Sequence, residues 1–301
     1  MRTTVLQPAP AGHEVEVVRR TETPFGIFLR RFRKNKLAIV GAVIIGTMIL
    51  LALFAPLIAP YDPISQDLEH LLESESATHL MGTDDLGRDV LSRIIYGTRI
   101  SLQASIYAVG IAFLIGVPVG LLSGYYRGFW DEWVIMRITD AVQAFPFLIL
   151  ALALAATLGA GLGNAMLAIG IGFSPAFIRI VRAQVMTVTN QEYIQAARAI
   201  GARDGRILLR HVLPNSMAPL LVQTTLAMAA AILAEASLSF LGLGVQPPTP
   251  SWGQMLNVAQ GYITFAPWLA YWPGLAIFAA VLAFNLLGDG VREALDPKMK
   301  S

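Results

Sequence analysis

Long apolar stretches without charged residues alternate with short polar stretches along most of this chain. A bilayer core about 30 Å thick takes roughly 20 apolar residues of α-helix, and stretches of this length recur through the sequence. Residues 141–178 are too many for one crossing, and the glycine-rich run GAGLGN at 159–164 divides them into a helical hairpin. The pattern predicts six membrane-spanning helices: two from that hairpin and the others at residues 37–59, 100–122, 217–241 and 268–287.

The composition also indicates an integral membrane protein. Hydrophobic residues make up 55% of the 301 positions and charged residues 14%, and the mean hydropathy is +0.60; a water-soluble fold lacks the polar surface to cover such a chain. The formal net charge of +2 is too small to indicate nucleic-acid binding. The absence of cysteine excludes disulfides, thiolate chemistry and Cys-ligated metals. The first 36 residues contain no early apolar run, so we expect an uncleaved first helix as the anchor.

The basic residues predict the orientation in the membrane. Of the 22 Lys and Arg residues, only Arg88, Arg93 and Arg99 fall in a segment assigned to the outside. Because Lys and Arg concentrate on the cytoplasmic side, both termini should be cytoplasmic. We expect a flexible cytoplasmic tail at residues 1–24 and a single transmembrane domain at residues 25–301. Within that domain, a cytoplasmic loop spans residues 187–215, and extracytoplasmic segments span about residues 60–99 and 242–267.

The cytoplasmic segment at residues 192–214 is charged, rich in small residues and without catalytic groups. Its local signals predict two short helices joined by a turn. Thr189 and Glu192 have the spacing of a capping box for the first helix, and Gly201 suits its left-handed end. Asp204 suits the cap of the second helix, and Pro214 suits its end.

Apolar and cationic side chains in this segment favour a protein partner. The expected apolar knobs are Ile194, Ile207, Leu208 and Leu209, and the cationic rim is Arg198, Arg203, Arg206 and Arg210. Such a surface suits recognition in which a helix lies in a groove of another protein. The alternative from the residues alone is an ordinary solvated loop.

Specific runs of residues extend this interpretation. EYIQAARAIGA at 192–202 and RHVLPN at 210–215 resemble the EAA motif of ABC importer permeases, whose coupling helix docks onto a nucleotide-binding subunit. Further runs are NKLAIVG at 35–41, APLIAPYDP at 55–63, MGTDDLGRDVLSRIIYGTRISL at 81–102, EASLSFLGLGVQPPTPSWG at 235–253 and AFNLLGDGVREALDP at 283–297. These runs resemble the second, C-type permease subunit of dipeptide, oligopeptide, nickel and glutathione importers.

The resemblance implies an all-α integral membrane protein with the permease fold of type I ABC importers, in the bacterial cytoplasmic (inner) membrane. It also implies partners: a second homologous permease subunit, one or two ABC ATPase subunits, an extracytoplasmic substrate-binding protein and membrane lipid, but no nucleic acid. The ATPase-coupling residues that it implies are Glu192, Ala196, Ala197, Arg198, Gly201, Ala202, Ile207, Arg210, Leu213 and Pro214.

The chain lacks the GxxxxGK[ST] phosphate-binding loop. We therefore expect it to bind no cofactor and to catalyse no reaction itself, with ATP and Mg bound by the partner ATPase subunits. The expected function is that of a permease subunit that imports di- and oligopeptides by alternating access. Nickel or glutathione remain open as cargo, and a self-sufficient secondary transporter or channel is the alternative from another class.

Few ionisable residues lie inside the predicted spans. Glu235, with Ser239 and Phe240 close in sequence, is a candidate gate or translocation-path residue because buried charge in a membrane is often functional. The alternative is a carboxylate that reaches the outer interface or makes a helix–helix hydrogen bond. Asp140 near Arg137 predicts a structural ion pair at the inner interface.

Two further groups of residues have plain structural interpretations. The acidic and imidazole side chains of the outer segment are His70, His79, Asp84, Asp85 and Asp89. Their spacing does not resemble a known ligand set, so we expect no metal site and assign them, with residues 246–252, to docking or to shaping the outer mouth. Glycines at positions 116, 120 and 124 predict close packing of the second span against another helix.

Overall fold

The computed structural model describes residues 24–295, and this part of the chain is helical, with no β structure beyond one isolated bridge between Thr83 and Asp89. The tail predicted at residues 1–24 lies outside the described residues, apart from Pro24, which begins the first helix. The α-helices are α1 (Pro24–Lys34), α2 (Lys36–Ile58), α3 (Val90–Tyr125), α4 (Met136–Ala144), α5 (Phe147–Leu158), α6 (Leu162–Val188), α7 (Glu192–Ala199), α8 (Asp204–Ile207), α9 (Leu213–Phe240), α10 (Trp252–Ala259) and α11 (Trp268–Leu295). Two π-helical turns, η1 (Trp130–Ile135) and η2 (Leu208–Val212), precede α4 and α9.

Five helices of the described chain are long and apolar enough to cross a membrane: α2, which is kinked at Phe54, α3, α6, the joined segment Asp204–Phe240, and α11. The sixth predicted span is broken, because η1 with α4 and then α5 meet at an angle of 94°. The prediction of an unbroken third helix beginning at residue 141 was therefore wrong. Phe145 is extended (ψ 137°), as a residue before proline usually is, and Pro146 has no N–H to continue a helix.

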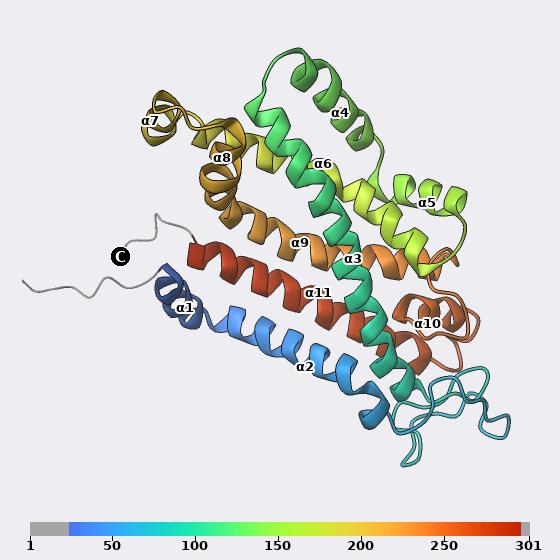
Figure 1. Cartoon of the computed structure of the whole chain (residues 1–301). Coiled ribbons are helices and arrows are strands. Elements are labelled where there is room, and N and C mark those ends of the chain that lie inside the picture. The colour runs from blue at the N-terminus through green and yellow to red at the C-terminus, as the bar shows by residue number, and fades with distance from the viewer. Residues whose placement is uncertain (1–23, 296–301) are drawn as a thin grey trace, which may run out of the picture.

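The glycines of α3 allow a close helix contact in the bundle. A Cβ added at Gly120 would lie 2.7 Å from the carbonyl oxygen of Ile178 and from Cβ of Val181 on α6. A Cβ at Gly124 would meet Cβ of Val185 at the same distance, one turn further on. The predicted close packing is confirmed, and its partner is α6, which α3 crosses in Figure 1.

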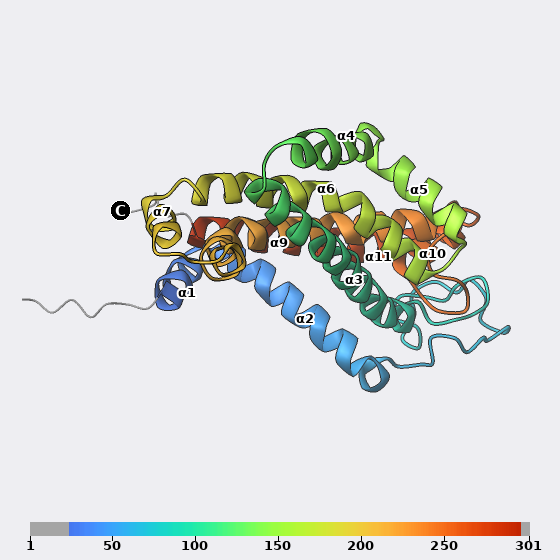
Figure 2. The ribbon, with the colours of Figure 1, turned by 45° about the horizontal axis from the view of Figure 1, so that its top comes forward.

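Two clusters of buried side chains hold the bundle together. One joins α3, α6 and α9, with Ile169, Phe177 and Leu220 among its members. The other joins α2, α10 and α11 and includes Trp252 and Phe284. Helices α4 and α5 lie along one edge of the bundle beyond α6, and α2 lies at the opposite edge (Figures 1 and 2).

Candidate functional site

The predicted coupling segment lies at the end of the molecule that also carries α1, the end with the basic cluster before α2 (Figure 1). It forms two helices, α7 and α8, as predicted. The second helix does not end at Pro214, however, since Asp204–Phe240 is one continuous helical segment of 37 residues. The π-helical turn η2 shifts the hydrogen-bonding pattern directly before Pro214, which occupies the first turn of α9, where a missing N–H is tolerated.

The local capping predictions for this segment had mixed outcomes. Gly201 adopts a left-handed conformation (φ 81°) after α7, as predicted. The capping box was wrong, because Gln191 is the N-cap residue of α7 and the Thr189 hydroxyl instead donates to the Val185 carbonyl oxygen at 2.8 Å. Asp204 is not a cap either, because it is the first residue of α8. Its carboxylate instead accepts hydrogen bonds from Tyr125, the last residue of α3, and from Tyr126, which follows α3.

The burial of the apolar side chains overturns part of the predicted docking surface. Ile194 and Ile207 are 0% exposed and Leu208 is 8% exposed, all within the cluster that joins α3, α6 and α9. These three side chains are therefore anchors in the core of this chain and not knobs for a partner. Ile200, at 85% exposed, and Leu209, at 66%, are the apolar side chains that this segment leaves open to a partner.

The other residues assigned to ATPase coupling lie on the surface or at its margin. Glu192, Ala196, Arg198, Gly201, Arg210 and Pro214 are exposed, whereas Ala197, Ala202 and Leu213 are half-buried. With Ile200 and Leu209 they form what we call the coupling surface: the exposed side of residues 192–214.

A polar cluster ties the coupling surface to the inner end of α3. The Tyr125 hydroxyl donates to Oδ1 of Asp204 at 2.6 Å, and the Tyr126 hydroxyl donates to Oδ2 at 3.2 Å. The guanidinium of Arg198 lies 5.1 Å from the centre of the Tyr125 ring, within range of a cation–π contact. Sequence reasoning missed both tyrosines, because they lie 79 and 78 residues away from Asp204.

Two ion pairs hold the broken third span against α6. The Asp131 carboxylate, on a residue 1% exposed, accepts from Nε and Nη2 of Arg182 at 2.8 and 2.6 Å, and the Ser123 hydroxyl also donates to it. The predicted structural ion pair of Asp140 is present, but its partner is Arg179, at 2.6 Å, and not the nearby Arg137. The Arg137 guanidinium instead lies 5.2 Å from the centre of the Trp133 ring.

The gate candidates occupy the outer end of α9. Glu235 is 0% exposed; its Oε1 accepts from the Ser239 hydroxyl at 2.7 Å, and its Oε2 has no hydrogen-bond partner among the described residues. The alternatives of a carboxylate at the outer interface and of a helix–helix bond both fail, because the side chain is buried and its bond lies within one helix. Phe240 is half-buried, and its carbonyl accepts from the Asn257 amide at 2.7 Å. Their role as a gate stays a prediction.

The outer segment forms a network of charged pairs. Among residues 24–295, no group of three or more acidic, His or Cys side chains is arranged to hold a metal ion. Asp84 pairs with Arg88 at 2.7 Å, and His79 pairs with Asp89 at 3.0 Å. Nδ1 of His70 donates a hydrogen bond to Oδ2 of Asp67 at 2.8 Å, and this bond raises the pKa of His70 and lowers the pKa of Asp67.

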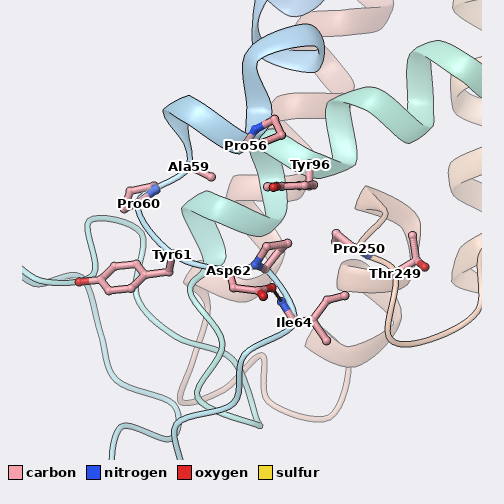
Figure 3. A pocket seen from close by; sticks show the side chains of 10 residues that line it. Pro56, Ala59, Pro60, Tyr61, Asp62, Ile64, Tyr96, Thr249 and Pro250 are labelled. Carbon is pink, nitrogen blue, oxygen red and sulfur yellow. Dashed lines mark hydrogen bonds between the residues drawn. The ribbon is translucent and has the colours of Figure 1, made fainter.

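The outer segment and the predicted mouth residues meet around a cavity of about 610 Å³. Figure 3 shows Asp62 and Ile64 from the outer segment, Tyr96 from α3, and Thr249 with Pro250 from the loop before α10 around it. Two segments far apart in sequence therefore shape one opening on the outer face, which is consistent with the place given to residues 246–252.

Comparison with known proteins gives the geometry a context. Residues 116–301 match the family described as binding-protein-dependent transport system inner membrane component, and residues 23–74 match the N-terminal transmembrane domain of oligopeptide transport permease C. The chain is 46% identical to the dipeptide transport system permease protein DppC of Alkalihalophilus pseudofirmus, over 99% of this chain and 97% of that protein. It is 48% identical to the glutathione transport system permease protein GsiD of Escherichia coli, over 93% of each chain.

A solved structure shows the same fold. An inward-facing structure of the MetNI methionine ABC transporter contains a chain similar to 68% of this one, with 97% of that chain covered. The TM-score is 0.55 and the sequence identity is 21%.

Proposed function

The chain belongs to the binding-protein-dependent inner membrane components, as a multi-pass permease subunit of an ABC transporter, and on that basis we propose that its complex imports di- and oligopeptides. The observation that best supports this cargo is the similarity to DppC, which extends over 99% of this chain. The match of residues 23–74 to the N-terminal domain of oligopeptide transport permease C supports the same cargo class.

The family implies ATPase and substrate-binding partners. We infer a heterodimer of this chain with a second homologous permease, served by one or two ATPase subunits that bind ATP and Mg, while this chain binds no nucleotide. The coupling surface would receive the ATPase: Ile200 and Leu209 offer apolar area, and Arg198 and Arg210 offer positive charge. ATP can drive transport through this surface only if its contacts differ in free energy between the two states of the permease.

Glutathione is a second candidate cargo, because the chain is 48% identical to GsiD over 93% of each chain. Glutathione is itself a small peptide with two carboxylates, so the two cargoes share most of their chemistry.

The test is ATP-driven uptake by the complete complex in proteoliposomes, with its binding protein supplied outside. Tritiated alanyl-phenylalanine and tritiated glutathione would be compared at equal concentrations, and omission of the binding protein would be the control. We expect uptake of the dipeptide to depend on both ATP and the binding protein. Uptake of glutathione without uptake of the dipeptide would refute the peptide cargo and favour the second candidate.

A further inference from the structure

One cavity near the inner ends of the helices has no role in the function described so far. It has a volume of about 670 Å³ and lies between α6, α9 and α11. The inner ends of these helices face the side of the molecule that carries α1 and α7 (Figure 1). The size lies within the range of about 300 to 1,000 Å³ that is usual for sites of small ligands.

Polar side chains from three helices line this cavity. Gln184 comes from α6, Gln223 from α9 and Arg292 from α11. Within residues 24–295 none of the three side chains makes a hydrogen bond or an ion pair. Two amides and one guanidinium therefore present donors and acceptors to a common space without using them on the protein itself.

The α9 wall of the cavity adds backbone polarity and a link to the coupling surface. Pro219 lines the cavity and has no N–H, so the carbonyl of Asn215, four residues earlier, loses its usual helical donor. The Asn215 amide donates to the His211 carbonyl at 2.6 Å and to the Tyr193 hydroxyl on α7 at 3.3 Å. A residue of the cavity wall is thus bonded directly to the coupling helix.

The chemistry of the lining selects a class of ligand. Amide side chains pair with peptide groups, since each offers a donor and an acceptor. The guanidinium pairs with a carboxylate through two parallel hydrogen bonds. No acidic side chain lines the cavity, and Val222 with its neighbours supplies apolar surface for side chains. A short peptide with a free C-terminal carboxylate matches all three features, whereas an ionised phosphodiester offers only acceptors and would leave the amide oxygens of Gln184 and Gln223 without a donor.

We propose that this cavity is a binding site of the permease for the transported peptide on its way to the cytoplasm. Arg292 receives the C-terminal carboxylate, and Gln184 and Gln223 bond the peptide groups. Because Asn215 joins this wall to Tyr193, occupancy of the site and the position of the coupling helix are linked. The inference rests on the proposed peptide cargo, and it names the residues that bind this peptide inside the permease.

Photo-crosslinking of the complete importer in lipid nanodiscs tests the site. The photoreactive residue p-benzoylphenylalanine would replace Val222 in the cavity or, as the control, Leu114 of α3, which is 73% exposed and away from the cavity. The probes are tritiated alanyl-phenylalanine and the same dipeptide with an amidated C-terminus, in the absence of nucleotide. We expect label at position 222 and not at position 114, with the free carboxylate favoured about tenfold over the amide.

Substitution of Arg292 tests the contact with the C-terminal carboxylate directly. Arg292→Gln should remove the preference for the free carboxylate, and Arg292→Lys should restore part of it, since the charge returns without the bidentate geometry. The Lys variant also controls for folding, together with basal ATPase activity of each complex.

The possible outcomes separate this inference from the proposed function. Peptide uptake with equal labelling at positions 222 and 114 would overturn the site and leave the cargo standing. Label at position 222 that ignores the carboxylate, or that anionic phosphatidylglycerol in the nanodisc suppresses, would overturn it in favour of a lipid headgroup site. Absence of any ATP-driven dipeptide uptake by the unaltered complex would refute the cargo and the site together.

Discussion

Truncation of Ile194 to alanine tests whether the coupling helix is anchored in the core of the permease. Ile194 is 0% exposed and belongs to the same buried cluster as Val185, Val188 and Ile207. Replacement of a fully buried Ile by Ala removes its transfer free energy and leaves a cavity, at a cost of about 2 to 5 kcal/mol. Because α7 has only 8 residues, this loss should open the helix locally rather than unfold the whole bundle.

Amide hydrogen exchange of the purified protein in detergent measures this opening. A loss of about 2 kcal/mol raises the population of the open form about 30-fold, so exchange at α7 should accelerate by at least that factor. The matched control is Ile200→Ala, in the same segment but 85% exposed, for which exchange should change less than about threefold. In the complete complex, the same Ile200 variant should instead weaken ATPase binding, because its side chain belongs to the coupling surface.

The two isoleucines therefore separate anchoring from docking. If Ile194→Ala and Ile200→Ala change exchange at α7 equally, the helix is not held by core burial and the assignment of anchors and contacts is wrong. An Ile194 variant that exchanges like the unaltered protein but binds the ATPase poorly would restore its interpretation as a knob.

Three further perturbations follow from the packing and the charges. Gly120→Ala should lower the free energy of unfolding, measured by thermal unfolding, by about 1 to 3 kcal/mol, because its Cβ would meet α6. A Cβ at Gly110, on the same helix, would meet nothing within 4 Å, so Gly110→Ala should be neutral or stabilising. Equal effects of the two substitutions would contradict the close approach of α3 to α6. Asp131→Asn should lower the free energy of unfolding by about 3 kcal/mol, because it leaves the partly buried guanidinium of Arg182 without its carboxylate. Asp140→Asn, at an exposed pair, should lower it by less than about 1 kcal/mol, and the reverse order would refute the burial argument. Because the hydrogen bond to Asp67 raises the pKa of His70 above its usual 6.5, this ion pair is fully present below pH 6.5 and is lost as the pH rises through the raised pKa. The protection factors of residues 66–73, which correct amide exchange for its intrinsic acceleration by base, should therefore fall above pH 6.5, and in His70→Gln they should no longer vary with pH in this range.

The sequence was sufficient for the spans because length and apolarity decide them. The break at Phe145 was missed although Pro146 stands in the printed sequence, since the uncharged run continues on both sides of it. Length alone does not distinguish a continuous helix from two short helices that meet at an angle.

The side-chain roles were harder to predict, because they depend on partners far away in the chain. Ile194 and Ile200 are the same residue type in one short segment, and only the way α7 packs into the cluster that joins α3, α6 and α9 decides which is buried. Asp140 illustrates the same limit: a nearby arginine at position 137 suggested the pair, whereas the structure brings Arg179 to it across 39 residues.

The continuity of α8, η2 and α9 bears on how the coupling surface acts on the rest of the permease. Asp204–Phe240 is one helical segment of 37 residues, about 55 Å long at 1.5 Å per residue. Asp204 stands at the coupling surface, Pro219 lines the inner cavity, and Glu235 lies near the other end. A helix without a flexible linker transmits displacement along its axis and does not absorb it. Movement of the ATPase-facing end relative to α3 would therefore shift the cavity wall and the buried carboxylate together, unless the π-helical turn η2 or the helix at Pro219 bends. These two points are where we expect the difference between the states of the permease to be concentrated.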